Sequence, residues 1–159
     1  MNYTIRKGTK EDADTILNLI KELADFEHSL SEVSNTNQQI IIDCFGVNSV
    51  CNFLIAEHEQ KAVGMAAYYT SYSTWVGKCL YLEDIIVSEK YRGQGIGQAL
   101  FDQMITLAKD GKYMRLEWQV LNWNMQAIDF YKKYDSKFLD EWLPCRLNYA
   151  QLQKIKVQL

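Results

Sequence analysis

Two neighbouring segments of the sequence carry residue types that could do chemistry. Glu83 and Asp84 interrupt the otherwise apolar segment LYLEDIIV, and the segment YRGQGIGQALF that follows holds three of the eight glycines, Gly93, Gly95 and Gly97. Ionised carboxylates are costly in an apolar strand without partners, and alternation along a strand predicts that these two point to opposite faces. A functional role is one interpretation, since both residues come just before the glycine-rich segment. A bent or edge strand with both carboxylates solvated is the other.

The glycines come directly before an apolar helical pattern, a position that suits anion binding. The first turn of a helix leaves N–H groups unpaired, its dipole favours negative charge, and glycines let an anion approach without Cβ clashes. Two familiar phosphate loops are excluded, because no Lys-Ser or Lys-Thr follows and Gln98 and Leu100 stand where a dinucleotide fingerprint needs glycine. Arg92 adds a cation before the turn. The alternative is a turn that only connects a strand to a helix.

Several separated segments resemble one enzyme family. The spelling R-x-x-G-x-G at 92–97 resembles the acetyl-coenzyme A-binding motif of the GNAT N-acetyltransferase superfamily. LIKELADFE, YSTWVGK, LYLEDIIV and WNMQAIDFYK resemble its diamine acetyltransferase branch, which acts on spermidine, spermine or thialysine. The resemblance implies an α/β fold with a mixed, mostly antiparallel sheet and helices on both faces. It also implies transfer of an acetyl group from acetyl-coenzyme A to the primary amine of a small cationic compound, by direct attack on the thioester.

The resemblance assigns the donor to one set of residues. The implied contacts to acetyl-coenzyme A are Ile85, Ile86, Val87, Arg92, Gly93, Gln94, Gly95, Ile96, Gly97, Asn124 and Lys133. The backbone of the strand at 85–87 would pair with the pantetheine arm, and residues 92–97 would surround the pyrophosphate. Asn124 is also expected to cap the helix that follows it, and the two roles are compatible.

The resemblance also assigns an acid, a base and an amine pocket. It implies Glu83 as the base through a water, Tyr131 as the general acid, and Asp84 and Glu27 as contacts to the amine. Deprotonating an alkyl amine at pH 7 costs ~4.6 kcal/mol, and proton transfer from an ordinary tyrosine to a thiolate is only ~2 kcal/mol uphill. From the residues alone, core packing explains Tyr131 better than catalysis does. A solvated helix end is an alternative explanation of Glu27.

Tyr72 and Trp75 flank the tip of an expected hairpin and form the last part of the predicted amine pocket. Aromatic faces attract cations, although covering a sheet edge explains Tyr72 as well. Ser73 and Thr74 stand where the spermidine-acetylating type has an acidic residue and proline, so a lysine-like or thialysine-like amine is favoured. The sequence departs from the family's pattern at two further places. The family's glycine after the general-acid helix is absent from KKYDSK, and the segment around Trp142 and Arg146 matches only loosely. A protein or aminoglycoside N-acetyltransferase, or a coenzyme A-binding module without catalysis, remain as alternatives.

Composition limits the class of protein. The 159 residues fit a single domain over 1–159, with 48% hydrophobic residues to build a core. A net charge of −3 argues against nucleic acid, and no apolar run is long enough to span a membrane. His28 and His58 have no spaced partner for a metal, and the four cysteines are scattered, so we expect no metal and a cytoplasmic location. The resemblance implies a homodimer.

The expected elements follow from periodicity and turn residues. Thr9 and Asp12 form a capping-box pattern before the first helix, and Gly111 is expected to end the third. We predict strands at 2–8, 52–58, 61–72, 78–88, 113–121 and 138–149, and helices at 10–27, 35–46, 96–110 and 124–134.

Overall fold

The computed structural model describes residues 2–157. The chain forms two compact units, Met1–Gln119 and Val120–Leu159. The prediction that residues 1–159 form a single domain stays a prediction.

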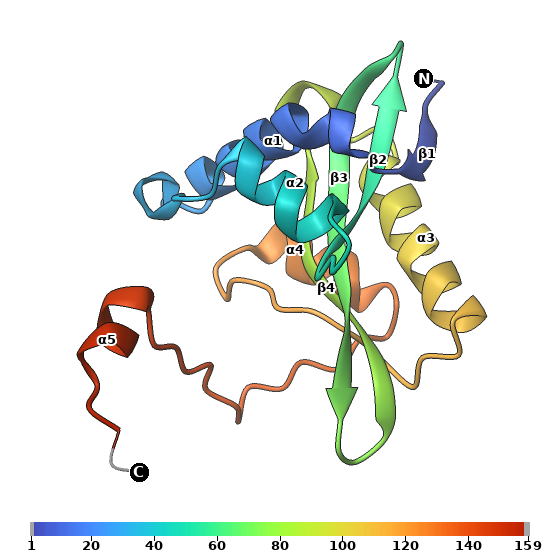
Figure 1. The fold of residues 1–159 in the computed structure, drawn as a ribbon. Helices are drawn as coiled ribbons and strands as arrows, with labels where there is room; N and C mark the ends of the chain where they lie inside the picture. The colour runs from blue at the N-terminus through green and yellow to red at the C-terminus, as the bar shows by residue number, and fades with distance from the viewer. Residues whose placement is uncertain (1, 158–159) are drawn as a thin grey trace. The chain divides into compact units, whose positions relative to one another are not determined.

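The first unit is built on a five-stranded sheet (Figure 1). In spatial order the strands are β1 (Thr4–Lys7), β2 (Asn52–His58), β3 (Lys61–Ser73), β4 (Gly77–Val87) and β5 (Leu116–Glu117). The first four pair antiparallel, and β5 pairs parallel to β4. The predicted mixed, mostly antiparallel sheet is confirmed.

Helices cover both faces of this sheet. Helices α1 (Ala13–Phe26) and α2 (Asn37–Phe45) lie together on one face (Figure 1). Their buried side chains share a core with inward residues of three strands; this core contains Ala13, Ile16, Leu19, Ile40, Phe53, Ile55, Met65, Ala67 and Ile86. Helix α3 (Ile96–Asp110) buries Leu100, Phe101 and Met104, and alternation directs the buried strand residues Leu54 and Ala66 toward it.

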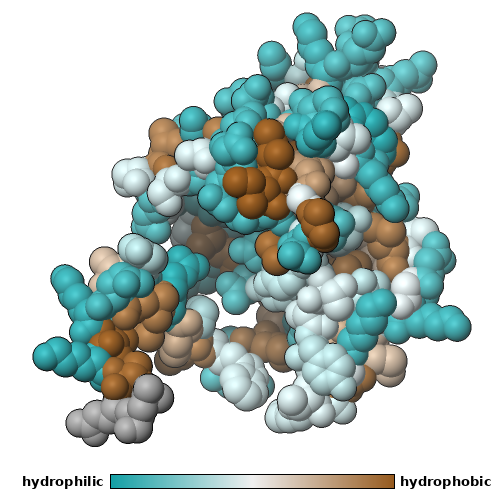
Figure 2. All heavy atoms as spheres, viewed as in Figure 1, coloured by the Kyte–Doolittle hydropathy of each residue, from teal (hydrophilic) through white to brown (hydrophobic). Residues whose placement is uncertain are grey.

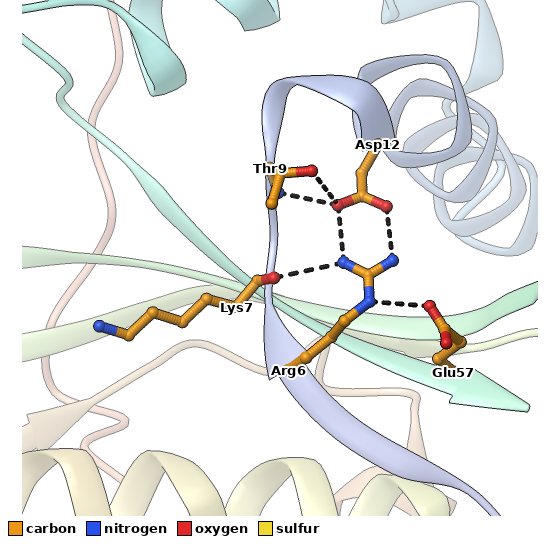
Figure 3. A network of polar contacts seen from close by, with 5 residues as sticks. All are labelled: Arg6, Lys7, Thr9, Asp12 and Glu57. Carbon is orange, nitrogen blue, oxygen red and sulfur yellow. Dashed lines mark hydrogen bonds and ion pairs between the residues drawn. The ribbon is translucent and has the colours of Figure 1, made fainter. Parts of the chain in front are cut away.

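An ion network fixes the start of α1 against the sheet (Figure 3). Arg6 on β1 donates to both carboxylate oxygens of Asp12, at 2.7 and 2.8 Å, and to Glu57 on β2 at 2.7 Å. The Thr9 amide donates to Asp12 at 2.8 Å, so the predicted capping box is present. The hydrogen bonds from Arg6 lower the pKa of Asp12 to about 2. Figure 2 shows polar side chains gathered over the upper part of the visible face, with a group of apolar side chains near its middle.

The second unit has less regular structure than the sequence predicts. Helix α4 (Met125–Lys132) begins where expected, and Asn124 Oδ1 accepts a hydrogen bond from the Ala127 amide at 3.1 Å. The strand predicted at 113–121 is also wrong in length, because only Leu116–Glu117, in the first unit, pairs with β4. The strand predicted at 138–149 is wrong within the described residues. That segment holds Pro144, which cannot donate to a ladder, and the short helix α5 (Tyr149–Lys154) follows it.

Candidate active site

A β-bulge places the two predicted carboxylates. Ala67 on β3 pairs with Asp84, but the next residue, Tyr68, pairs with Leu82, so Glu83 is an extra residue on β4. Asp84 shares its face with Ile86 and Ala67, which belong to the core beneath α1 and α2. The bulge interrupts the alternation, and Glu83 falls on this same face. The prediction that Glu83 and Asp84 point to opposite faces is wrong, because alternation fails at a bulge.

Three carboxylates gather at this bulge. Burial, followed by the charges of Glu83 and Glu27, raises the pKa of Asp84 to about 6. Glu27 comes from the end of α1, and partial burial raises its pKa as well. Glu83 is exposed. The structure therefore brings together three of the residues predicted for the amine site, and their combined negative charge suits a cationic ligand.

A stacked tyrosine pair beside Glu83 was missed by the sequence analysis. Tyr69 on β3 pairs with Tyr81 on β4, and their ring centroids lie 5.1 Å apart at 28°. Burial and then the Glu83 charge raise the pKa of Tyr69 to about 12, and the same two causes raise the pKa of Tyr81. The signal in the sequence was the period-two spacing of Tyr81 and Glu83. Tyr69 joins this pair through the register of β3 against β4, and a sequence alone does not reveal strand register.

The predicted hairpin aromatics lie farther along the sheet. Tyr72 pairs with Lys78, and Tyr72 and Trp75 are 78% and 81% exposed. At ~3.3 Å per residue, Lys78 and Glu83 are roughly 16 Å apart along β4. The structure does not bring Tyr72 and Trp75 to the carboxylates, and their part in amine binding stays a prediction.

The glycine-rich turn has a backbone that only glycine adopts without strain. Gly93 and Gly95 have positive φ angles of 73° and 82°. A Cβ added at Gly93 would meet no atom within 4 Å, so packing does not require a glycine there. Gly95 directly precedes α3 and has no side chain to cap it. The amides in the first turn of a helix lack partners within the helix, and such donors suit an anion.

Arg92 is partly engaged within the chain. Its Nε donates to the Val87 carbonyl at 2.9 Å, and its guanidinium carbon lies 5.2 Å from the centroid of the Phe26 ring. These contacts hold the turn against β4 and α1. The predicted contact between Arg92 and a phosphate stays a prediction.

The edge of β4 next to this turn is open. Strand β5 pairs only with Leu80 and Tyr81, and within residues 2–157 no strand pairs with Leu82–Val87 on that side. Unpaired backbone groups along an edge are a template for an extended ligand. Ile85, Ile86 and Val87, predicted to contact the donor, lie on this open edge.

The other predicted residues belong to the second unit. Tyr131 is buried in α4, its ring centroid lies 5.2 Å from that of Phe130, and burial raises its pKa to about 12. Asn124 caps α4, and Lys133 is the exposed residue at its end. Residues 2–157 contain no group of three or more His, Cys, Asp or Glu arranged to hold a metal. None of the helices in this range is long and apolar enough to span a bilayer.

Comparisons with known proteins agree on one family. The model of the acetyltransferase (GNAT) family matches residues 14–135. Thialysine N-epsilon-acetyltransferase of Caenorhabditis elegans is 34% identical over 156 residues, with 96% of each chain covered. The Bos taurus enzyme of that name is 37% identical over 145 residues, covering 86% of this chain and 85% of its own. An integron cassette protein from the mobile metagenome of V. cholerae shares the fold, with a TM-score of 0.78, 23% identity and 97% of each chain covered. This chain belongs to the GNAT acetyltransferase family and is an acyltransferase.

Proposed function

We propose that this enzyme acetylates the primary amine of a small cationic compound, with a thialysine-like or lysine-like amine favoured. The observation that carries this proposal is the bulge in β4, which puts Glu83 and Asp84 on one sheet face, close enough to Glu27 at the end of α1 for its charge to act on Asp84. Similarity to thialysine N-epsilon-acetyltransferases over most of the chain supports the same choice. A diamine or polyamine is the second candidate, because a human spermidine/spermine N(1)-acetyltransferase-like protein is 37% identical over 94% of this chain.

The residues around α3 fit the proposed donor, acetyl-coenzyme A, which would supply the acetyl thioester. The turn at 92–97 combines positive-φ glycines, free space above Gly93 and the helix amides. Ile85, Ile86 and Val87 present an open strand edge. We assign the diphosphate to the turn and the extended arm to the edge, with Asn124 and Lys133 as further contacts.

The carboxylates have separate tasks in this proposal. Glu83 is exposed and takes the proton of the ammonium group through a water. Asp84 and Glu27 hold the cation, because a nearby positive charge relieves the repulsion among the three acids. Tyr69 and Tyr81 add an aromatic surface on the same face.

Tyr131 is proposed as the general acid for the departing thiolate. Its pKa of about 12 makes it a weaker acid than an ordinary tyrosine. Proton transfer to a thiolate of pKa ~8.5 is then ~5 kcal/mol uphill, against the ~2 kcal/mol expected from sequence. We propose that Tyr131 delivers its proton as the thiolate forms, so that the free thiolate need not accumulate. A homodimer and a cytoplasmic location complete the proposal, and sedimentation analysis would test the dimer.

A thiol-release assay tests the proposed function. Wild-type protein is given acetyl-coenzyme A with thialysine, lysine, ornithine, spermidine, an aminoglycoside or a lysine peptide. We expect the highest kcat/KM with thialysine or lysine, and loss of turnover in Glu83→Gln. Preference for the peptide or the aminoglycoside would favour the alternative substrate classes. Coenzyme A binding without turnover of any amine would favour a non-catalytic module.

A further inference from the structure

One acidic residue on α1 is bonded to the segment that leads into the glycine turn. Glu22 accepts two hydrogen bonds there, from the Ser88 hydroxyl at 2.7 Å and from the Glu89 amide at 3.0 Å. Ser88 and Glu89 directly follow β4, and Ser88 is also held by its amide, which donates to the Val63 carbonyl at 2.9 Å. Both oxygens of the Glu22 carboxylate are therefore used to fix the point where the chain leaves the sheet.

The same face of α1 contacts the other end of this segment. Phe26 lies four residues after Glu22, so the two side chains project from one helix face, one turn apart. The Phe26 ring lies beneath the guanidinium of Arg92, at 5.2 Å. Helix α1 thus holds residues 88–92 at both ends, immediately before the positive-φ glycines.

The charge of Glu22 has the wrong sign for this location. A carboxylate near an anion-binding turn repels phosphate, so electrostatics alone predicts that neutralising Glu22 would strengthen donor binding. Its two hydrogen bonds predict the opposite, because a misplaced turn no longer presents its amides to the anion. The two effects can therefore be separated by experiment.

We infer that Glu22 is a positioning residue for the donor site: it fixes the 88–92 segment on α1 so that the glycine turn is preformed. This inference rests on the proposed donor role of residues 92–97. Glu22 contacts neither the reacting atoms nor the carboxylate cluster in this account, so its effect should fall on the donor and spare the amine.

The test compares variants by calorimetry with coenzyme A and by steady-state kinetics. We expect Glu22→Ala to raise the Kd for coenzyme A and the KM for acetyl-coenzyme A about 10-fold, because two hydrogen bonds to a charged acceptor are lost. kcat at saturating donor and the amine KM should change less than about 2-fold. Glu22→Gln keeps an acceptor and should raise the donor KM only about 3-fold. Asp25→Asn on the same helix is the matched control for charge and should leave both KM values unchanged.

A second variant separates lost folding from lost positioning. Ser88→Ala removes one hydroxyl and should raise the Kd for coenzyme A about 3-fold. Combining it with Glu22→Ala should raise this Kd no further than Glu22→Ala does alone. Tighter or unchanged coenzyme A binding in Glu22→Ala or Ser88→Ala would overturn the inference. Wild-type protein that neither binds coenzyme A nor releases thiol would instead overturn the proposed function.

Discussion

The ionised Asp84 side chain in the carboxylate cluster reduces the stability of the fold near neutral pH. Burial and its acidic neighbours raise the pKa of Asp84 to about 6, well above that of an aspartate in an unfolded chain. The folded state therefore binds this proton more tightly than the unfolded state does. The contribution of Asp84 to stability is fully present below about pH 4 and is lost as the pH rises through 6.

Replacing Asp84 should increase stability and impair binding. We expect Asp84→Asn to raise the free energy of unfolding at pH 8 by on the order of 2 kcal/mol, because an ionised buried carboxylate is removed. The amine KM should rise about 10-fold, since a charge contact to the cation is lost. Urea denaturation at pH 8 and pH 5 measures the first effect. The exposed Asp140→Asn is the control, and a less stable Asp84→Asn at pH 8 would contradict the assignment.

The raised pKa of Tyr131 predicts how kcat depends on pH. With a pKa of about 12, Tyr131 stays protonated throughout the range of ordinary assays, so a general acid at this position produces no falling limb of kcat below about pH 10. Tyr131→Phe should lower kcat about 100-fold or more. The kcat–pH profiles of both proteins provide the measurement. Undiminished turnover in Tyr131→Phe would remove the proposed role.

At the scale of elements, local patterns predicted most of the first unit. The strands at 52–58, 61–72 and 78–88 alternate or run apolar between turn residues, and the helix at 96–110 has its predicted bounds. The prediction of side-chain placement failed where it depends on pairing between strands that are distant in the sequence. The bulge at Glu83 and the partnership of Tyr69 with Tyr81 depend on strand register. Apolar residues at 138–149 resemble a strand, yet Leu139, Trp142 and Leu143 are exposed with no strand partner within the described residues.

Gly64 on β3 tests the packing of β4. A Cβ at this position would lie 2.7 Å from the Ile86 carbonyl oxygen and 3.3 Å from the Val87 Cα. Both contacts are to backbone, so we expect Gly64→Ala to destabilise the fold by about 2 kcal/mol and to weaken coenzyme A binding. Gly97→Ala is the matched contrast: its Cβ would meet Val87 Cγ2 at 3.7 Å, and stability should be kept. Thermal unfolding of both variants measures this difference. Equal stability of Gly64→Ala and Gly97→Ala would contradict the predicted clash at Gly64.

For the molecule as a whole, the Arg6 network ties the start of the chain to α1 and β2. Because Arg6 lowers the pKa of Asp12 to about 2, this carboxylate stabilises the fold above about pH 4, and the stabilisation is lost as the pH falls toward 2. We therefore expect Asp12→Asn to lower the free energy of unfolding by about 2 kcal/mol at pH 7 and by much less near pH 2.5. Urea titrations at both values measure the difference.

The control for this prediction is an exposed ion pair. Asp129 contacts Lys132 at 2.9 Å on the surface of α4, and Asp129→Asn should change stability little at either pH. An equal loss in Asp12→Asn at pH 7 and pH 2.5 would mean that packing, and not the ionised carboxylate, accounts for its effect.

The unpaired side of β4 also has a consequence for handling the protein. Apart from the Val87 carbonyl, which accepts a hydrogen bond from Arg92, the backbone between Leu82 and Val87 has no strand partner on that side within the described residues. Such an edge can pair with a strand of a neighbouring molecule as well as with the proposed pantetheine chain. Concentrated, warmed samples lacking coenzyme A should therefore precipitate sooner than samples saturated with it, and light scattering during storage would record the delay.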